Sequence, residues 1–263
     1  AWSKSIHSHE DLFTEGGGFR SLAVLFGGQS DSAMARPFAV ALHPSGGLLV
    51  ADPGRARVHF YKWSQRRYYA LGAERKGGLP SPVGVAALAD GRILVSDSRL
   101  DAVLVYGPDG KPEGTFAEGT TLGRPAGIAV DEARGEVYIA DVTNHQIDVF
   151  DRQGKLLRKL GKRGDGEGEF NFPTHLALTP EGDLAVADSM NWRVEIVKPD
   201  GTFVRSIGAL GDAPGKFSTP KGVALDAGGR LIAVEGLHDA LQFFSPKGEL
   251  LLSIGQSCSR AGE

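Results

Sequence analysis

The sequence has very little cysteine: Cys258 is the single thiol among 263 residues. One thiol excludes an intrachain disulfide, and without a CxxC pair the chain lacks the usual signature of multi-thiolate zinc or covalently attached haem. No apolar run approaches the roughly 18 residues that span a membrane as a helix. Positive charge is not in excess either, because 29 Lys and Arg face 32 Asp and Glu, a formal net charge of −3. That balance argues against a protein whose main role is to coat nucleic acid.

Glycine and proline, in contrast, are abundant, at 37 and 14 residues, which is typical of many short strands joined by tight turns. One motif recurs five times: a proline, an apolar stretch with alanine four residues after the proline, a turn, and a strand that ends in an acidic residue. The repeats are 43 to 48 residues apart, which is the length of one β-propeller blade. The anchor prolines are Pro37, Pro82, Pro125, Pro173 and Pro220.

Each unit has room for four strands, A to D. In the fourth unit the turn Pro199-Asp-Gly separates the last two strands, because proline presets φ and glycine accepts positive φ. The pattern predicts strand A at His175–Leu178, strand B at Leu184–Ala187, strand C at Arg193–Val197 and strand D at Phe203–Ile207.

Strand B of every unit ends in an acid. Such repetition argues against catalysis, because a catalytic site needs different residues in different roles. We therefore interpret the acids as structural groups that accept backbone N–H bonds from the turn between strands B and C. They are Asp52, Asp97, Asp141, Asp188 and Glu235.

Two segments carry a family resemblance. Asp141-Val-Thr-Asn-His-Gln-Ile147 and Gly164-Asp-Gly-Glu-Gly-Glu-Phe-Asn-Phe-Pro173 resemble the NHL repeat, which is named for its Asn-His-Leu segment. The resemblance covers roughly residues 20–255 and implies a β-propeller, usually of six blades, that is used mostly as a binding platform. Some relatives are enzymes, so the resemblance constrains the fold more than the function.

The ends of the chain bear on how the propeller closes. We expect an all-β, six-bladed propeller of NHL-type repeats whose last blade is incomplete. Residues 28–255 would form five full blades, residues 1–27 would add strands C and D of the sixth, and residues 256–263 would be a tail in the same domain. A strand A for that blade would come from a continuation of the chain beyond Glu263 or from another chain by β-augmentation, or the ring would close as five blades plus a hairpin.

The strand order also predicts a binding edge. In an antiparallel blade the B–C and D–A loops emerge on one edge, and we expect these loops to be longer and more varied than the turns opposite. We propose them as the surface that engages a protein or peptide. Trp192 is an aromatic residue at a loop tip beside Arg193, a combination typical of interface hot spots, although Trp192 could instead pack against a neighbouring loop. The candidate partner-binding residues are Arg55, Arg57, Asn144, His145, Asn191, Trp192, Arg193 and His238.

Enzymatic and nucleic-acid functions remain as alternatives. Peptidyl-amidoglycolate lyases are similar propellers that hold zinc with histidines from several strands A, but His175 is the one histidine at such a position here. We expect no catalytic residue, metal or cofactor. The alternatives are a metal-dependent lyase or lactonase-like enzyme, and an RNA-binding propeller. A start at Ala1 rather than methionine is consistent with an exported protein whose signal peptide was removed, and a cytoplasmic fragment would look the same.

Overall fold

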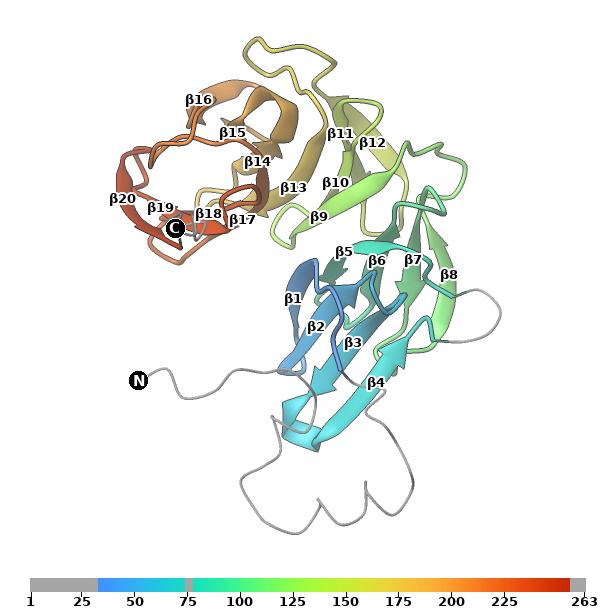
Figure 1. The fold of residues 1–263 in the computed structure, drawn as a ribbon. Helices are drawn as coiled ribbons and strands as arrows, with labels where there is room; N and C mark the ends of the chain where they lie inside the picture. The colour runs from blue at the N-terminus through green and yellow to red at the C-terminus, as the bar shows by residue number, and fades with distance from the viewer. Residues whose placement is uncertain (1–32, 74–77, 256–263) are drawn as a thin grey trace, which may run out of the picture. The chain divides into compact units, whose positions relative to one another are not determined.

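The computed structural model of the protein describes residues 33–73 and 78–255. Within those ranges the chain is all-β, and twenty strands form five four-stranded sheets (Figure 1). In each sheet the strands lie side by side in chain order, so each sheet is one blade with strands A, B, C and D. The expectation of an all-β propeller is therefore confirmed.

The strand bounds follow the repeat. Blade 1 comprises β1 (Ala39–His43), β2 (Gly47–Asp52), β3 (Arg57–Lys62) and β4 (Arg67–Leu71), and blade 2 comprises β5 (Pro82–Ala87), β6 (Ile93–Asp97), β7 (Ala102–Tyr106) and β8 (Pro112–Phe116). Blade 3 comprises β9 (Pro125–Asp131), β10 (Glu136–Asp141), β11 (Gln146–Asp151) and β12 (Leu156–Leu160). Blade 4 comprises β13 (Pro173–Leu178), β14 (Leu184–Asp188), β15 (Arg193–Val197) and β16 (Phe203–Ile207). Blade 5 comprises β17 (Pro220–Leu225), β18 (Leu231–Glu235), β19 (Ala240–Phe244) and β20 (Leu250–Ile254).

The chain divides into two compact units, Ala1–Leu100 with Leu104–Gly114 and Asp101–Val103 with Thr115–Glu263. Blade 1 and most of blade 2 belong to the first unit, and blades 3 to 5 belong to the second. Two short 3-10 helices, η1 (Trp63–Gln65) and η2 (Ser189–Asn191), lie between strands. No helix in the described part of the chain is long and apolar enough to cross a membrane.

The expected six-bladed propeller is wrong: the described residues form five blades. Each anchor proline begins one blade, so five prolines account for five blades. The sixth had rested on a weaker pattern in residues 1–27, which has no anchor proline, and on the usual blade number of the family. Residues 1–27 and 256–263, to which the closing strands and the tail were assigned, lie outside the described residues.

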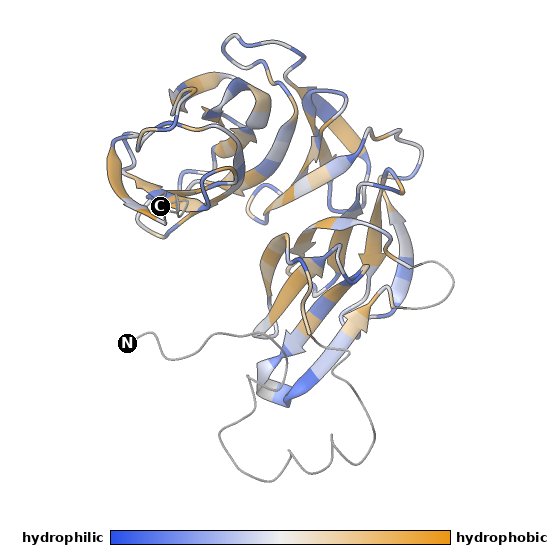
Figure 2. Ribbon diagram, viewed as in Figure 1, coloured by the Kyte–Doolittle hydropathy of each residue, from blue (hydrophilic) through white to orange (hydrophobic). Residues whose placement is uncertain are grey.

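Apolar side chains between neighbouring blades form the core within each unit. Figure 2 shows many hydrophobic strand segments joined by mostly hydrophilic loops. Between blades 4 and 5 the core includes Phe217, which comes from the D–A loop and is fully buried. Gly208 packs against its ring with φ at +84°, and a Cβ there would collide with the ring. A side chain at Gly208 would be disfavoured both by its φ and by this contact.

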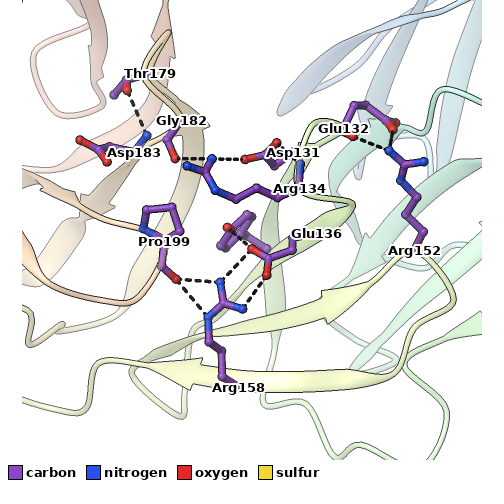
Figure 3. Close-up of polar contacts among 11 residues, drawn as sticks. Asp131, Glu132, Arg134, Glu136, Arg152, Arg158, Thr179, Gly182, Asp183 and Pro199 are labelled. Atoms are coloured by element: carbon purple, nitrogen blue, oxygen red, sulfur yellow. Dashed lines mark hydrogen bonds and ion pairs between the residues drawn. The ribbon is translucent and has the colours of Figure 1, made fainter.

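The A–B and C–D turns of neighbouring blades are joined by side chains that reach the next blade. In the second unit, Arg134 donates to the carbonyl of Gly182 at 3.3 Å, and Arg158 donates to the carbonyl of Pro199 at 2.8 and 3.1 Å (Figure 3). Glu136 holds Arg158 in place through two further bonds of 2.6 and 2.8 Å. Blade 2 offers the equivalent two carbonyls to blade 1, but there the donors lie at the ends of strands A and C: His43 bonds to Gly91 and Lys62 to Pro108.

The face of blade 5 that points away from blade 4 is apolar and exposed. Ile254 closes strand D there and is 51% exposed, whereas Leu160 and Ile207 at the same position of blades 3 and 4 are 3% exposed. Val234 and Leu241 on the same face are also exposed. Blades 3 and 4 bury the apolar residues of this face against the next blade. In blade 5 the equivalent residues are exposed.

Candidate functional site

The five B–C turns share one length and one backbone feature. Each contains four residues, and the fourth has φ between +49° and +56° although it is never glycine. The B–C loops were expected to be longer and more varied than the turns on the opposite edge, and for their length this is wrong. The D–A loops are the longer loops of this edge, and their length varies from 8 to 12 residues. The five residues with positive φ are Ala56, Asp101, His145, Trp192 and Asp239.

The acid at the end of each strand B explains this uniformity. In blade 2, Asp97 accepts backbone N–H bonds from Arg99 and Leu100 in the B–C turn, at 2.9 and 3.1 Å. It also accepts one from Ser81, in the D–A loop before the blade, at 2.8 Å. The carboxylate is fully buried. One acid therefore ties two loops together, which confirms the predicted turn cap and adds a bond to the D–A loop that the sequence pattern did not reveal.

The same arrangement recurs in the other blades, with one variation. Glu235 binds the backbone N–H groups of Ser218 and Thr219 in the D–A loop and that of Leu237 in the turn. In blades 3 and 4 the turn contributes a side-chain amide instead: Asn144 donates to Asp141, and Asn191 donates to Asp188, both at 2.7 Å. The Asn of the family motif therefore completes the cap in these two blades.

A second buried polar position lies in the middle of strand C. In blade 4, Glu195 accepts the backbone N–H of Gly168 at 2.5 Å, and in blade 5 Gln242 accepts that of Gly215 at 2.6 Å. Gln242 also donates to the carbonyl of Lys216 at 2.7 Å. Side chains of strand C thus hold the 12-residue D–A loops before these two blades by hydrogen bonds to the loop backbone. The sequence does not reveal this position, because its loop partners lie 26 or 27 residues away.

Arg193 completes the support of the D–A loop of blade 4. Its guanidinium pairs with Asp188 at 3.0 Å and with Glu195 at 2.6 Å, and it donates to the loop carbonyls of Asp165, Gly166 and Glu169 at 2.8 to 2.9 Å. The side chain is only 14% exposed. This residue, a candidate for partner binding, is therefore bonded mainly to its own protein.

Burial changes the acidity of these groups. Burial raises the pKa of Glu195 to about 7, although the Gly168 N–H and Arg193 act in the opposite direction. Burial also raises the pKa of Asp188. In blade 3, burial raises the pKa of Asp148, and the nearby Asp141 carboxylate adds to the effect. Ionisation of the strand C acids Glu195 and Asp148 therefore lowers the free energy of unfolding.

Among the other candidates, exposure varies widely. Arg55 and Asn144 are exposed, Arg57 and Asn191 are partly buried, and His145 is buried. Arg55 and Arg57 belong to the first unit, and the remaining candidates belong to the second.

Three candidates with rings contact their own protein. Trp192 is partly buried against the apolar core between blades 4 and 5, in agreement with the packing alternative. His145 accepts the N–H of Phe172 at 3.2 Å, and His238 lies 3.3 Å from Asp212.

Chemical groups for catalysis are sparse in the described residues. They contain no cluster of three or more His, Cys, Asp or Glu side chains that could hold a metal ion. Burial lowers the pKa of His175 to about 4, so this histidine is neutral at pH 7. A shallow hollow of about 480 Å³ lies at the C–D turn of blade 3 and is lined by Thr115, Glu118, Gln153, Gly154, Lys155 and Leu156.

Comparison with known proteins agrees with the repeat. The NHL repeat profile matches residues 122–150, which run from the end of a D–A loop through β9 and β10 into β11. Human NHL-repeat-containing protein 4 is 31% identical over 107 residues, an alignment that covers 41% of this chain and 84% of the human protein. The chain belongs to the NHL-repeat family. Its NHL blades therefore account for the anchor prolines, the strand B acids and the Asn-His segment together.

Other relatives of this NHL-repeat protein are much longer. Protein brain tumor of Drosophila melanogaster is 32% identical over 73 residues, which cover 28% of this chain and 6% of the relative. B-box type zinc finger protein ncl-1 of Caenorhabditis elegans is 29% identical over 138 residues, which cover 48% of this chain and 15% of the relative. The chain thus spans a small part of the length of these two proteins.

Solved structures share the fold at low sequence identity. A catalytically inactive virginiamycin B lyase from Staphylococcus aureus with quinupristin has a TM-score of 0.65 at 13% identity, over 86% of this chain and 72% of the lyase. A chain of a nidogen/laminin complex has a TM-score of 0.65 at 18% identity, over 83% of this chain and 80% of that chain. At these identities the likeness shows the propeller fold alone.

Proposed function

We propose that this NHL-repeat protein is a non-enzymatic binding propeller that engages a protein or peptide through its B–C/D–A loop edge. The observation that carries the proposal is a B–C turn of constant length and shared positive φ that carries four different residue types at its third position among the five blades. At the third position of the turn the residues are Arg55, Leu100, Asn144, Asn191 and His238. A rigid scaffold with variable loop side chains is a common arrangement for recognition.

The opposite edge supports the same assignment. In the second unit the charged side chains there, such as Arg134 and Arg158, bond to the neighbouring blade (Figure 3). Those bonds stabilise the propeller and leave fewer groups for a partner. Two of the structural neighbours also fit a binding role in a general way, since one is found in a nidogen/laminin complex and one in a structure with quinupristin. The second of these is a lyase, so the fold by itself does not decide between binding and catalysis.

A quantitative capture experiment tests the proposal. The full chain is used as bait in an extract of the source organism, beside a loop-edge variant (Arg55→Glu with Arg99→Glu) and an opposite-edge variant (Lys155→Glu with Lys247→Glu). We expect at least one protein to be captured by the wild type and the opposite-edge variant and to be lost with the loop-edge variant. Equal loss with both variants would contradict the assignment of the edge. A stoichiometric zinc or calcium ion in the purified protein would instead favour an enzyme.

A further inference from the structure

Two arginines meet at the loop edge of blade 1. The backbone N–H groups of Arg36 and Arg55 both donate to the same oxygen of Asp52, Oδ1, at 2.9 and 3.2 Å. The loops also touch beside this oxygen, because a Cβ on Gly54 would lie 2.9 Å from the Cβ of Arg36. The D–A segment and the B–C turn therefore hold the two arginines side by side. Arg36 was not among the sequence candidates; its position directly before an anchor proline was the available signal.

The side chains of these two arginines extend into solvent. Both residues are exposed, and neither guanidinium forms a hydrogen bond or ion pair with any described residue. Arg57 lies next to them and donates from Nε to the carbonyl of Arg55 at 3.3 Å. The carboxylate of Asp52 is fully buried and bonds to backbone N–H groups and to His59, and it forms no ion pair with either guanidinium. Two exposed like charges that start from adjacent backbone positions favour the binding of an anion between them.

Exposed positive charge is in excess among the described loop residues of blades 1 and 2 on this edge. Arg99 is a further exposed base in the B–C turn of blade 2, and the exposed Asp101 is the acidic residue of that turn, whereas Asp97, like Asp52, is fully buried. On the second unit the exposed loop residues are mixed in sign: Asp101, Asp165, Glu167, Asp212 and Asp239 accompany Arg124, Lys162, Arg163 and Lys216. The net charge of −3 conceals this local excess of positive charge.

We propose that Arg36 and Arg55 form an anion subsite that binds a carboxylate-rich segment of the partner. The planar guanidinium matches a carboxylate in a two-bond geometry, and two neighbouring arginines accommodate successive acidic side chains. A nucleic acid carries a charge at every nucleotide and needs a longer basic track, whereas the loops of the second unit offer mixed charge. The inference rests on the proposed function and specifies the chemistry of its partner.

Fluorescence anisotropy with a labelled oligo-glutamate peptide tests the subsite on the full chain. Oligo-glutamine serves as the neutral probe and oligo-uridylate RNA as the nucleic-acid probe. We expect oligo-glutamate to bind, and Arg36→Glu with Arg55→Glu to weaken its binding at least about tenfold, which corresponds to the loss of one charge-assisted hydrogen bond. The matched control is Arg66→Glu with Arg67→Glu, two exposed arginines at the C–D turn of the same blade, for which we expect less than about a twofold change.

The outcomes separate the subsite from the proposed function. If the charge reversal unfolds the chain, Arg36→Gln with Arg55→Gln removes the charge and keeps both backbone N–H bonds to Asp52. The subsite is overturned if oligo-glutamate does not bind, if both arginine pairs matter equally, or if oligo-uridylate binds more tightly through Arg36 and Arg55. If a partner is still captured through the loop edge in any of these cases, only the subsite is lost; without capture, the proposed function is lost as well.

Discussion

Arg193 pairs with Asp188 at the boundary between strand B and strand C of blade 4, with Nε 3.0 Å from Oδ2. The same guanidinium holds three carbonyls of the D–A loop. Arg193→Ala should therefore loosen residues 164–170, because these carbonyls lose their donor, while the loop before blade 5, which Gln242 holds, stays protected. Hydrogen exchange measured by mass spectrometry reports both loops in one experiment. Equal protection of residues 164–170 in the variant and the wild type would show that Arg193 does not support this loop.

The strand B acids should be structural in every blade. Asp97→Ala removes an acceptor shared by three backbone N–H groups, and we expect it to lower the free energy of unfolding by about 2 kcal/mol, since partly buried donors are left unsatisfied. Asp97→Asn keeps one oxygen and should cost less. Urea unfolding followed by circular dichroism measures both. An unchanged unfolding midpoint together with a loss of partner binding would contradict the structural role.

Glu195 should make stability depend on pH. Its pKa is raised to about 7 in the folded protein, above the unfolded value of about 4.3, so the folded state binds the proton more tightly. Stability is then lost as pH rises between these two values. Glu195→Gln should flatten that decline in thermal unfolding between pH 4.5 and about 7.

Blade 5 offers the matched control for this prediction, because Gln242 occupies the same position there. Gln242→Glu should add a decline of the same sign in the same range of pH. If Glu195→Gln has the same pH profile as the wild type, Glu195 is not the group responsible.

Much of this fold follows from the sequence, because the repeat fixes it locally. The predicted strands Arg193–Val197 and Phe203–Ile207 agree with the structure to the residue, since the Pro-Asp-Gly turn between them sets both ends. Strand A of that blade begins earlier than predicted, at Pro173, because proline is tolerated at the first position of a strand.

The hydrogen bonds that hold the D–A loops could not be predicted from the sequence in the same way. The bond from Gly168 to Glu195 joins residues 27 positions apart, and only the folded blade brings them together. Arg193 illustrates the consequence, because its sequence context suggested an exposed hot spot whereas its guanidinium binds the protein's own loop. The blade number was wrong for a related reason, because it depended on segments without the repeat motif.

The exposed face of blade 5 should tolerate truncation. Leu160→Ala removes a side chain buried between blades 3 and 4, and we expect a loss of about 2–4 kcal/mol. Ile254→Ala at the equivalent position of blade 5 should cost less than about 1 kcal/mol, because this side chain is already 51% exposed. Chemical denaturation of the two variants makes the comparison. Equal losses would show that Ile254 is covered in solution.

Site-specific photocrosslinking tests the central claim, the use of the B–C/D–A loop edge for binding, most directly. A photoreactive amino acid is placed at Arg55, Asn144 or His238 on that edge, or at Lys111, Lys155 or Lys247 on the C–D turns, and each variant is irradiated with the captured partner. We expect crosslinks from the loop edge and none from the C–D turns. Crosslinks that form only from the C–D turns would contradict the account.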